Sequence, residues 1–414
     1  MVVWLDRVAL ALTLVLPAFV MHGRGIADGM ISLVGLIFVL RSALTGQWRW
    51  VRTPWLMVGW VWWGWQVLCS VPGIGIGGER SLVQALVMVR FLVFVAALEH
   101  GVLAAAAARR GMQWVLAGCA VYIAAQTWLQ FAIGWNVQGF SRWGEGELTG
   151  PFQQPRAAAP LSRLLFPAML PAVEGLLSRS WVAAMGVAVV GIGTVVLIGQ
   201  RMPVLLVVLG LVTTALLLPR LRRVMVVALG AGAVLLAALP VVSPPAYYRL
   251  VEKFSAQMAH FPDSDYGLLA ARAATIAYDH PMLGRGFDGF RNACPDPQYH
   301  RGWGLAPLHP DGGGAGICNI HPHNHYLEAV TNAGVPGLVL FSALVVAWLT
   351  ALAKGLGARS DPLRVGLFVA ALIQEWPLAS ASGFSAVEIA GLFFIQLGLG
   401  LALARAARLQ DDAI

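Results

Sequence analysis

Three histidines at alternate positions form the densest group of potentially reactive side chains in the sequence. They are His321, His323 and His325, in the run His321-Pro322-His323-Asn324-His325. In an extended segment, residues two apart point to the same side, so this spacing suits a metal ion. An imidazole that titrates near neutral pH also suits a general base that accepts a proton from a hydroxyl nucleophile. A third reading is a set of hydrogen-bonded polar side chains without chemistry, and the spacing alone does not decide.

Arginines in or beside apolar stretches form a second group. Arg201 follows an apolar stretch, and Arg163 lies within another one, seven residues after Arg156. Because seven residues make about two helical turns, Arg156 and Arg163 share a helical face. A guanidinium is always charged and binds phosphate oxygens through a planar fork. We expect these arginines to bind an anionic head group, although Arg201 also fits a side chain that reaches the membrane surface from a hairpin.

The composition indicates where these residues lie. The chain of 414 residues is 58% hydrophobic and 12% charged. Soluble proteins carry charge at roughly a quarter of their positions, so a water-soluble enzyme, a disordered chain and a secreted disulfide scaffold are excluded. The sequence has no Walker-type loop, dinucleotide fingerprint or metalloprotease helix, which argues against a nucleotide-driven pump. Most of the chain is therefore expected to lie in lipid.

The apolar stretches predict helices that cross a membrane, which takes about 20 residues each. The sequence predicts an all-α integral membrane protein with about 12 transmembrane helices. The predicted spans are residues 5–22, 25–41, 54–70, 80–98, 112–133, 157–177, 181–199, 203–219, 224–241, 335–353, 365–380 and 386–404.

The basic residues predict the orientation of these spans. With both termini in the cytoplasm, fifteen Lys and Arg residues lie on the cytoplasmic side and five lie in short loops on the other side. Basic residues in short loops resist translocation, so this bias indicates cytoplasmic termini. The net charge of +8 would suggest a nucleic-acid partner in a soluble protein. Here it is mainly a topology signal.

One polar segment interrupts the apolar pattern. We divide the chain into residues 1–241 with nine spans, residues 242–334 as a large periplasmic loop, and residues 335–414 with three spans and a cytoplasmic tail. A long polar loop among short hairpins is usually functional. We expect short helices in it, including one over residues 264–279 that bears Arg272, and irregular structure over residues 284–316.

The loop also contains two cysteines, Cys294 and Cys318. In an oxidising periplasm a disulfide between them would stabilise the loop by about 3 kcal/mol in the chain-entropy model. Paired and free thiols are both compatible with the sequence.

The loop motifs resemble those of the bacterial O-antigen ligase and polymerase superfamily, and most of all the lipopolysaccharide O-antigen ligases. The family pattern of His-Asn, nine residues, Gly, two residues and Gly is met by His323-Asn324, Gly334 and Gly337. Further matching positions are Arg201, Arg272, Asp279-His280-Pro281, Gly284-x-Gly286, Phe290 and the block Gly150 to Pro155. Arg156 stands where Asn is common in the family.

The resemblance implies a metal-independent, inverting membrane glycosyltransferase of the GT-C type that needs no cofactor. Its donor would be a glycan on polyprenyl (undecaprenyl) diphosphate, and its acceptor a sugar hydroxyl of lipid A-core at the periplasmic face of the inner membrane. It implies His323 as the catalytic base and Arg201 and Arg272 as diphosphate ligands. Weaker candidates for orienting donor or acceptor are Asn324, His325, Arg156 and Arg163. No nucleotide or nucleic acid takes part.

Three alternatives remain open at this point. An O-antigen polymerase would use the same donor with a second lipid-linked glycan as acceptor, and a protein O-oligosaccharyltransferase would use a Ser or Thr hydroxyl. From another class, a transporter of an anionic lipid or solute would line its path with the same arginines. Unlike the enzymes, a transporter would form no new glycosidic bond.

Overall fold

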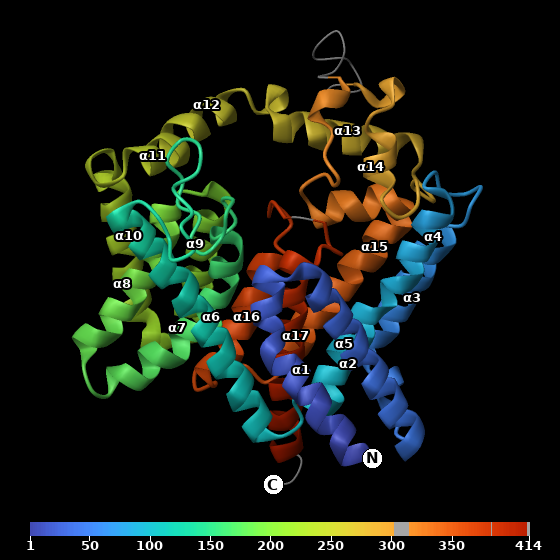
Figure 1. Cartoon of the computed structure of the whole chain (residues 1–414), viewed down its shortest axis with the longest axis horizontal. Coiled ribbons are helices and arrows are strands. Elements are labelled where there is room, and N and C mark those ends of the chain that lie inside the picture. Colours follow the sequence, from blue (N-terminus) through green and yellow to red (C-terminus); the bar gives the residue numbers. More distant parts are fainter. Residues whose placement is uncertain (302–313, 382, 412–414) are drawn as a thin grey trace.

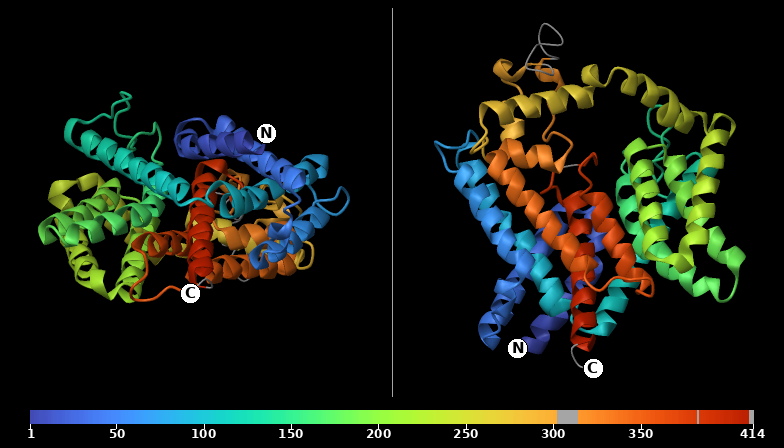
Figure 2. Two further views of the ribbon diagram at one scale, coloured as in Figure 1. Left: turned by 90° about the horizontal axis from the view of Figure 1, so that it is seen from below. Right: turned by 180° about the vertical axis from the view of Figure 1, so that it is seen from behind.

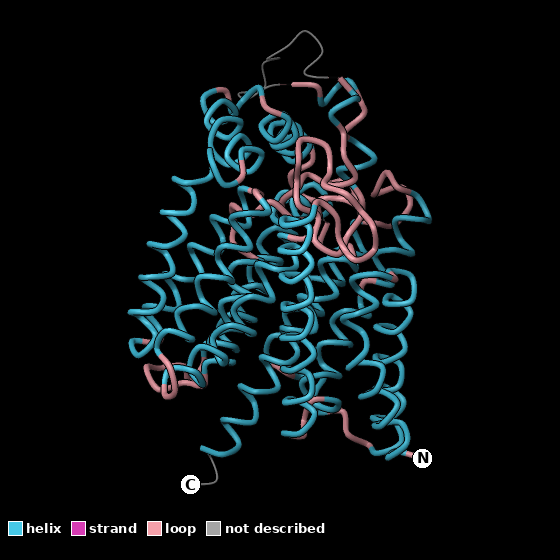
Figure 3. The backbone as a smooth tube through the Cα atoms, turned by 60° about the vertical axis from the view of Figure 1, so that its left-hand side comes forward, coloured by secondary structure: helices cyan, strands magenta, loops and turns pink. Residues whose placement is uncertain are grey.

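The protein is built from helices. The computed structural model describes residues 1–301, 314–381 and 383–411, and within these ranges the only β pairing is a few isolated bridges in loops (Figure 3). The all-α class is therefore confirmed. The helices that precede the polar segment are α1 (Val2–His22), α2 (Arg24–Thr45), η1 (Arg49–Arg52), α3 (Pro54–Cys69), α4 (Gly78–Val87), α5 (Val89–Ala97), η2 (Leu98–Val102), α6 (Ala106–Ile133), α7 (Ala158–Leu177), α8 (Trp181–Ile198), α9 (Arg201–Leu217), η3 (Pro219–Leu221) and α10 (Arg222–Val242).

The polar segment contains short helices, and three long helices follow it. The short elements are α11 (Pro244–Tyr247), η4 (Tyr248–Glu252), α12 (Lys253–Ala259), η5 (Phe261–Asp263), α13 (Asp265–Asp279), α14 (Gly289–Ala293), η6 (Pro297–Tyr299) and η8 (Ala315–Ile317). The last three are α15 (His325–Ala353), α16 (Pro362–Gln374) and α17 (Val387–Asp411). The helix expected over residues 264–279 is confirmed as α13, which Ser264 caps by accepting from the N–H of Gly267. Part of the stretch expected to be irregular, residues 302–313, lies outside the described residues.

Every predicted span overlaps a helix or a pair of helices, although α16 ends at Gln374, before the end of the predicted span 365–380. Eight helical segments in the described part of the chain are long and apolar enough to cross a membrane, and α9 and α16 are shorter apolar helices. Large apolar side chains such as Leu36, Val121 and Val234 are exposed along the helices. Because exposed apolar surface of this extent needs lipid around it, the chain is a multi-pass membrane protein. The number of twelve crossings stays a prediction.

The helices form two groups joined by an arch (Figures 1 and 2). Helices α6 to α10 lie on one side, and α1 to α5 pack with α15 to α17 on the other. The two groups meet where α7 packs against α16. The elements α11, α12 and α13 run across the top, so the polar segment bridges both groups. The N-terminus and the end of α17 lie at the opposite end of the molecule, and we call the two ends the loop side and the terminus side.

Helix α15 contains a sharp kink that positions the loop. Gly334 has φ 68° and ψ −170°, a conformation that essentially only glycine adopts. An added Cβ there would lie 2.4 Å from the carbonyl oxygen of Met282. The connection between α13 and α14 packs into this kink. The N–H of Gly286 donates to the carbonyl of Asn332 at 2.8 Å, and the N–H of Val335 donates to the carbonyl of Pro281 at 2.7 Å. The motif Gly284-x-Gly286 and the motif with Gly334 and Gly337 thus contact each other through the backbone.

Candidate active site

A polar cavity opens on the loop side between the two groups of helices. It has a volume of about 640 Å³, and its polar lining includes His22, Arg24, Arg156, Arg163, Gln200 and His323. No carboxylate belongs to this lining, as far as the chain is described. Three guanidinium groups contribute to this lining, and guanidinium groups bind phosphate oxygens, so the cavity suits an anion such as a phosphate or diphosphate.

His323 reaches the cavity from an unusual backbone conformation. Its φ is 57°, and its carbonyl accepts from the N–H of Ala381, which lies in the α16–α17 connection and also lines the cavity. The ring packs edge-on against Tyr266 and His321, with centroid distances of 5.6 Å and 4.6 Å. Nε2 lies 3.0 Å from the amide nitrogen of Asn319. Burial lowers the pKa of His323 below 6.5, so the ring is neutral at pH 7 and able to accept a proton.

Asn324 fixes the backbone around His323. Its Oδ1 accepts from the N–H groups of Tyr326 and Leu327 and so caps α15. Its Nδ2 donates to the carbonyl of Pro377 at 2.7 Å. Asn324 therefore ties the start of α15 to the α16–α17 connection, and its place in the His-Asn motif has a structural explanation.

The three alternate histidines do not converge, which corrects the geometry that their spacing suggested. Helix α15 begins at His325, so the segment is not extended there. The Nδ1 of His325 lies 2.9 Å from the carboxylate of Glu375 at the end of α16. In the described part of the chain, no three His, Cys, Asp or Glu side chains are grouped to hold a metal ion.

The connection between α6 and α7 brings Arg156 to the cavity, and α7 brings Arg163. Because α7 begins at Ala158, the predicted helical face shared by the two arginines is wrong. The buried amide of Gln130 accepts from the N–H of Thr149 at 2.7 Å, and Asn136 donates to the carbonyl of Gly150 at 2.7 Å. Gln200 donates to the carbonyl of Pro155 and holds the other end of this block. Arg163 is only 4% exposed, although it lines the cavity from the first turns of α7.

Arg201 lies beside the cavity and is not part of its lining. Its Nε donates to the carbonyl of Arg249 at 2.9 Å, a second nitrogen donates to Gln257, and the guanidinium lies over the ring of Phe254. Tyr266 lies near this guanidinium and also packs on His323. The structure thus links two of the predicted site residues through a tyrosine.

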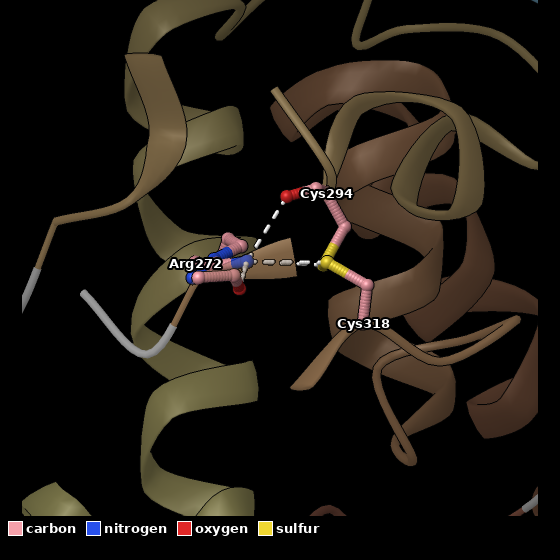
Figure 4. The surroundings of a disulfide bond; sticks show 4 residues. Arg272, Cys294 and Cys318 are labelled. Atoms are coloured by element: carbon pink, nitrogen blue, oxygen red, sulfur yellow. Dashed lines mark hydrogen bonds between the residues drawn. A yellow bond between two sulfur atoms is a disulfide. The ribbon is translucent and has the colours of Figure 1, made fainter. Parts of the chain in front are cut away.

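Arg272 occupies a different environment, in the small core of the loop (Figure 4). Its side chain is 1% exposed, and Nη1 donates to the carbonyls of Cys294 at 3.1 Å and Gly314 at 2.8 Å. It also contacts the sulfur of Cys318, which forms a disulfide with Cys294. The structure therefore does not bring Arg272 to the cavity, and its role as a diphosphate ligand stays a prediction.

The comparison with known families adds independent information. Residues 186–342 match the O-antigen ligase family model. This domain match supports membership of the O-antigen ligase and polymerase superfamily. The match includes Arg201, Arg272 and His323, and it indicates a glycosyltransferase-type activity. No curated protein matches the chain significantly.

Four residues near the superfamily's histidine were not singled out by the sequence. Arg24, Gln200 and Tyr266 come from separate elements, so no local spacing connects them to His323, whereas Asn319 lies four residues before it. Arg24 gave a weak signal, because it is a basic residue in one of the short non-cytoplasmic loops, which are expected to contain few Lys and Arg residues. The only sequence signal for the other three was a position near a motif residue: Gln200 adjoins Arg201, Tyr266 is near Arg272, and Asn319 is near His323.

Proposed function

We propose that the chain transfers a glycan from polyprenyl diphosphate to a sugar hydroxyl of lipid A-core, which completes lipopolysaccharide. The observation that carries the proposal is that a half-buried His323, whose pKa is lowered by burial, lines the same cavity as three arginines. A lipid-linked diphosphate donor carries the anionic group that such a cavity would bind. The hydroxyl acceptor needs the base.

The reaction we propose is a single displacement. The acceptor oxygen attacks the anomeric carbon, its proton passes to His323, and the bond from that carbon to the diphosphate oxygen breaks with the electron pair leaving on the diphosphate. Attack from the opposite side inverts the anomeric configuration. Negative charge grows on the leaving group in the transition state, so arginines already in place stabilise that state more than the bound donor.

Arg156 and Arg163 are our first candidates for contact with the diphosphate, because both line the cavity with His323. Arg201 lies next in the chain to the cavity residue Gln200 and joins this group through Tyr266. No nucleotide is needed because cleavage of the diphosphate linkage supplies the free energy. We propose that no metal is needed either, since a neutral imidazole and fixed cations cover proton transfer and leaving-group stabilisation.

The proposed location is the periplasmic face of the bacterial inner membrane. The bias of basic residues toward the terminus side supports cytoplasmic termini. The disulfide between Cys294 and Cys318 on the loop side supports an oxidising compartment there. A periplasmic site would meet the glycan donor after it has crossed the membrane.

A deletion strain of the source bacterium tests the proposal. Loss of all lipopolysaccharide bands with O-antigen, while lipid-linked polymer persists, is the expected result. A single repeat unit that remains attached to core would indicate a polymerase instead. Unchanged lipopolysaccharide together with an unglycosylated protein fraction would indicate protein O-glycosylation, and unchanged glycans altogether would contradict an enzyme of this superfamily.

A further inference from the structure

Asn319 holds the ring of the proposed base from the loop side. Its Nδ2 lies 3.0 Å from Nε2 of His323, four residues further along the chain. The backbone of His323 is fixed separately, through the N–H of Ala381 and the cap at Asn324. Rotation of the imidazole about its own bonds is not fixed by those contacts. The side chains that restrain the ring are Asn319, Tyr266 and His321.

The contact with Nε2 determines which nitrogen can exchange a proton. When the amide N–H donates to Nε2, the ring proton lies on Nδ1. When the amide is turned by 180°, its oxygen accepts from the N–H at Nε2, and Nδ1 carries the lone pair that a base needs. An amide can present either group, and its orientation follows the hydrogen bonding around it. Asn319 occupies Nε2 in both arrangements, but only the second leaves Nδ1 able to accept a proton, so the proposed base requires the Asn319 oxygen at Nε2.

The position of Asn319 is determined by its neighbour in the chain. Cys318 is joined to Cys294 with a Cα–Cα distance of 5.8 Å, and Cys294 is fully buried in a small core with Leu269, Phe290 and Tyr299. Arg272 strengthens this junction because Nη1 bonds the carbonyls of Cys294 and Gly314 and the sulfur of Cys318. A chain of contacts therefore runs from the loop core through the disulfide to Asn319 and His323.

We propose that Asn319 is a positioning residue for His323, and that Arg272 and the disulfide hold Asn319 in place. This inference rests on the proposed function, because it assigns an orienting partner to the proposed base. It has the logic of other catalytic sites in which a third group orients the base and stabilises its protonated form. It also gives Arg272 a function in catalysis that needs no contact with the substrate.

Substitution of Asn319 in purified protein tests the proposal. Asn319→Ala should lower kcat by roughly 10- to 100-fold with little change in KM, because the base loses its orientation. Asn319→Asp places a carboxylate on Nε2 and should move the acid limb of the pH–rate profile upward by on the order of one unit. The other charged or titratable groups that contact His323 or line its cavity are His321, Tyr266, His22, Arg24, Arg156 and Arg163, and none of them changes in this comparison.

A matched control separates positioning from a general effect on the loop. Gln298→Ala removes an exposed amide of the same loop that bonds only Asp296 among its described contacts, and it should leave kcat and the acid limb unchanged. Wild-type kcat in Asn319→Ala together with an unmoved acid limb in Asn319→Asp would overturn the proposal. If wild-type protein forms no glycosidic bond in the same assay, the proposed function fails first, and the two failures are distinguishable.

The disulfide offers a second, independent measurement. A double variant, Cys294→Ala with Cys318→Ala, should lose kcat by a factor similar to that of Asn319→Ala. Adding Asn319→Ala to it should cost little more, because both changes act through the same contact. Losses that multiply would contradict the proposed chain of contacts.

Discussion

The Nδ1 of His325 lies 2.9 Å from the carboxylate of Glu375, and the two side chains are 5% and 1% exposed. The pair joins the start of α15 to the end of α16, where the connection that contacts His323 begins. Arg163 contributes a positive charge that interacts with Glu375. The charged cavity is thus supported by a buried network, and His325 belongs to that support.

Removal of this carboxylate should destabilise the protein. Glu375→Ala leaves the buried imidazole and guanidinium without their anion, a change that typically costs about 3–5 kcal/mol. Glu375→Gln, which keeps the size and one acceptor, should cost less. The midpoint of thermal unfolding in detergent measures both, with the exposed Glu79→Ala as the control. Unfolding of Glu375→Ala at the wild-type midpoint would show that the pair contributes nothing.

The kink at Gly334 predicts a large effect of one methyl group. Gly334→Ala forces a conformation that costs about 1–3 kcal/mol and places Cβ against the carbonyl of Met282. Gly64→Ala is the matched control, because that glycine lies in α3 with no atom within 4 Å of a new Cβ. It should leave the unfolding midpoint unchanged or raise it, since Ala favours a helix by up to about 1 kcal/mol. Equal midpoints for the two variants would refute the assigned role of the kink.

The cavity arginines should affect use of the donor. Loss of a hydrogen bond to a charged group costs about 1.5–3 kcal/mol, so Arg156→Gln should lower kcat/KM for the donor by roughly 10- to 150-fold. Arg163→Lys keeps the charge and loses the planar fork, and it should show a smaller decrease. Arg80→Gln removes an exposed charge on the loop side outside the cavity and serves as control. An equal decrease of kcat/KM in the control would show that the effect comes from the overall charge and not from contact of the cavity arginines with the donor.

Burial of the histidines predicts the pH dependence of transfer. The pKa of His323 is lowered by burial, and burial with the adjacent imidazoles lowers the pKa of His321 to about 4. A lowered pKa keeps the base neutral at pH values where a free imidazole is already protonated, so the acid limb of kcat/KM should have its midpoint below pH 6.5. Because the pKa values of these histidines are lower in the folded protein than in the unfolded chain, the free energy of unfolding should decrease as the pH falls below 6.5. An acid limb at or above 6.5 would contradict the buried site, and His260→Gln, an exposed loop histidine, should not move it.

The sequence predicts the helices well because long apolar stretches have few alternatives in a membrane. It also identifies the glycine motifs, although only the structure shows that Gly286 and Val335 bond residues of the other motif. The common side for the three histidines was wrong because a helix starts at His325 and turns its ring toward Glu375. No local pattern reports such a change of direction.

The site itself could be predicted only in part. His323, Arg156 and Arg163 were candidates before the structure, and they line one cavity. Burial of Arg272 beside a disulfide could not be inferred, because its partners are 22 to 46 residues away. Tyr266 approaches His323 from α13, and this contact depends on tertiary packing that spacing does not encode. Asn319 is only four residues before His323, but the sequence shows no pattern that predicts the backbone path that joins their side chains.

The most direct test of the account is glycan transfer by purified protein in vesicles that contain a polyprenyl-diphosphate-linked glycan and lipid A-core. Wild-type protein should form the glycosidic bond with inverted configuration, in the presence of a chelator as well as in its absence. His323→Ala should reduce the rate by at least about 100-fold while it folds normally and still binds the donor. A variant without His323 that transfers glycan at the wild-type rate would contradict the central claim.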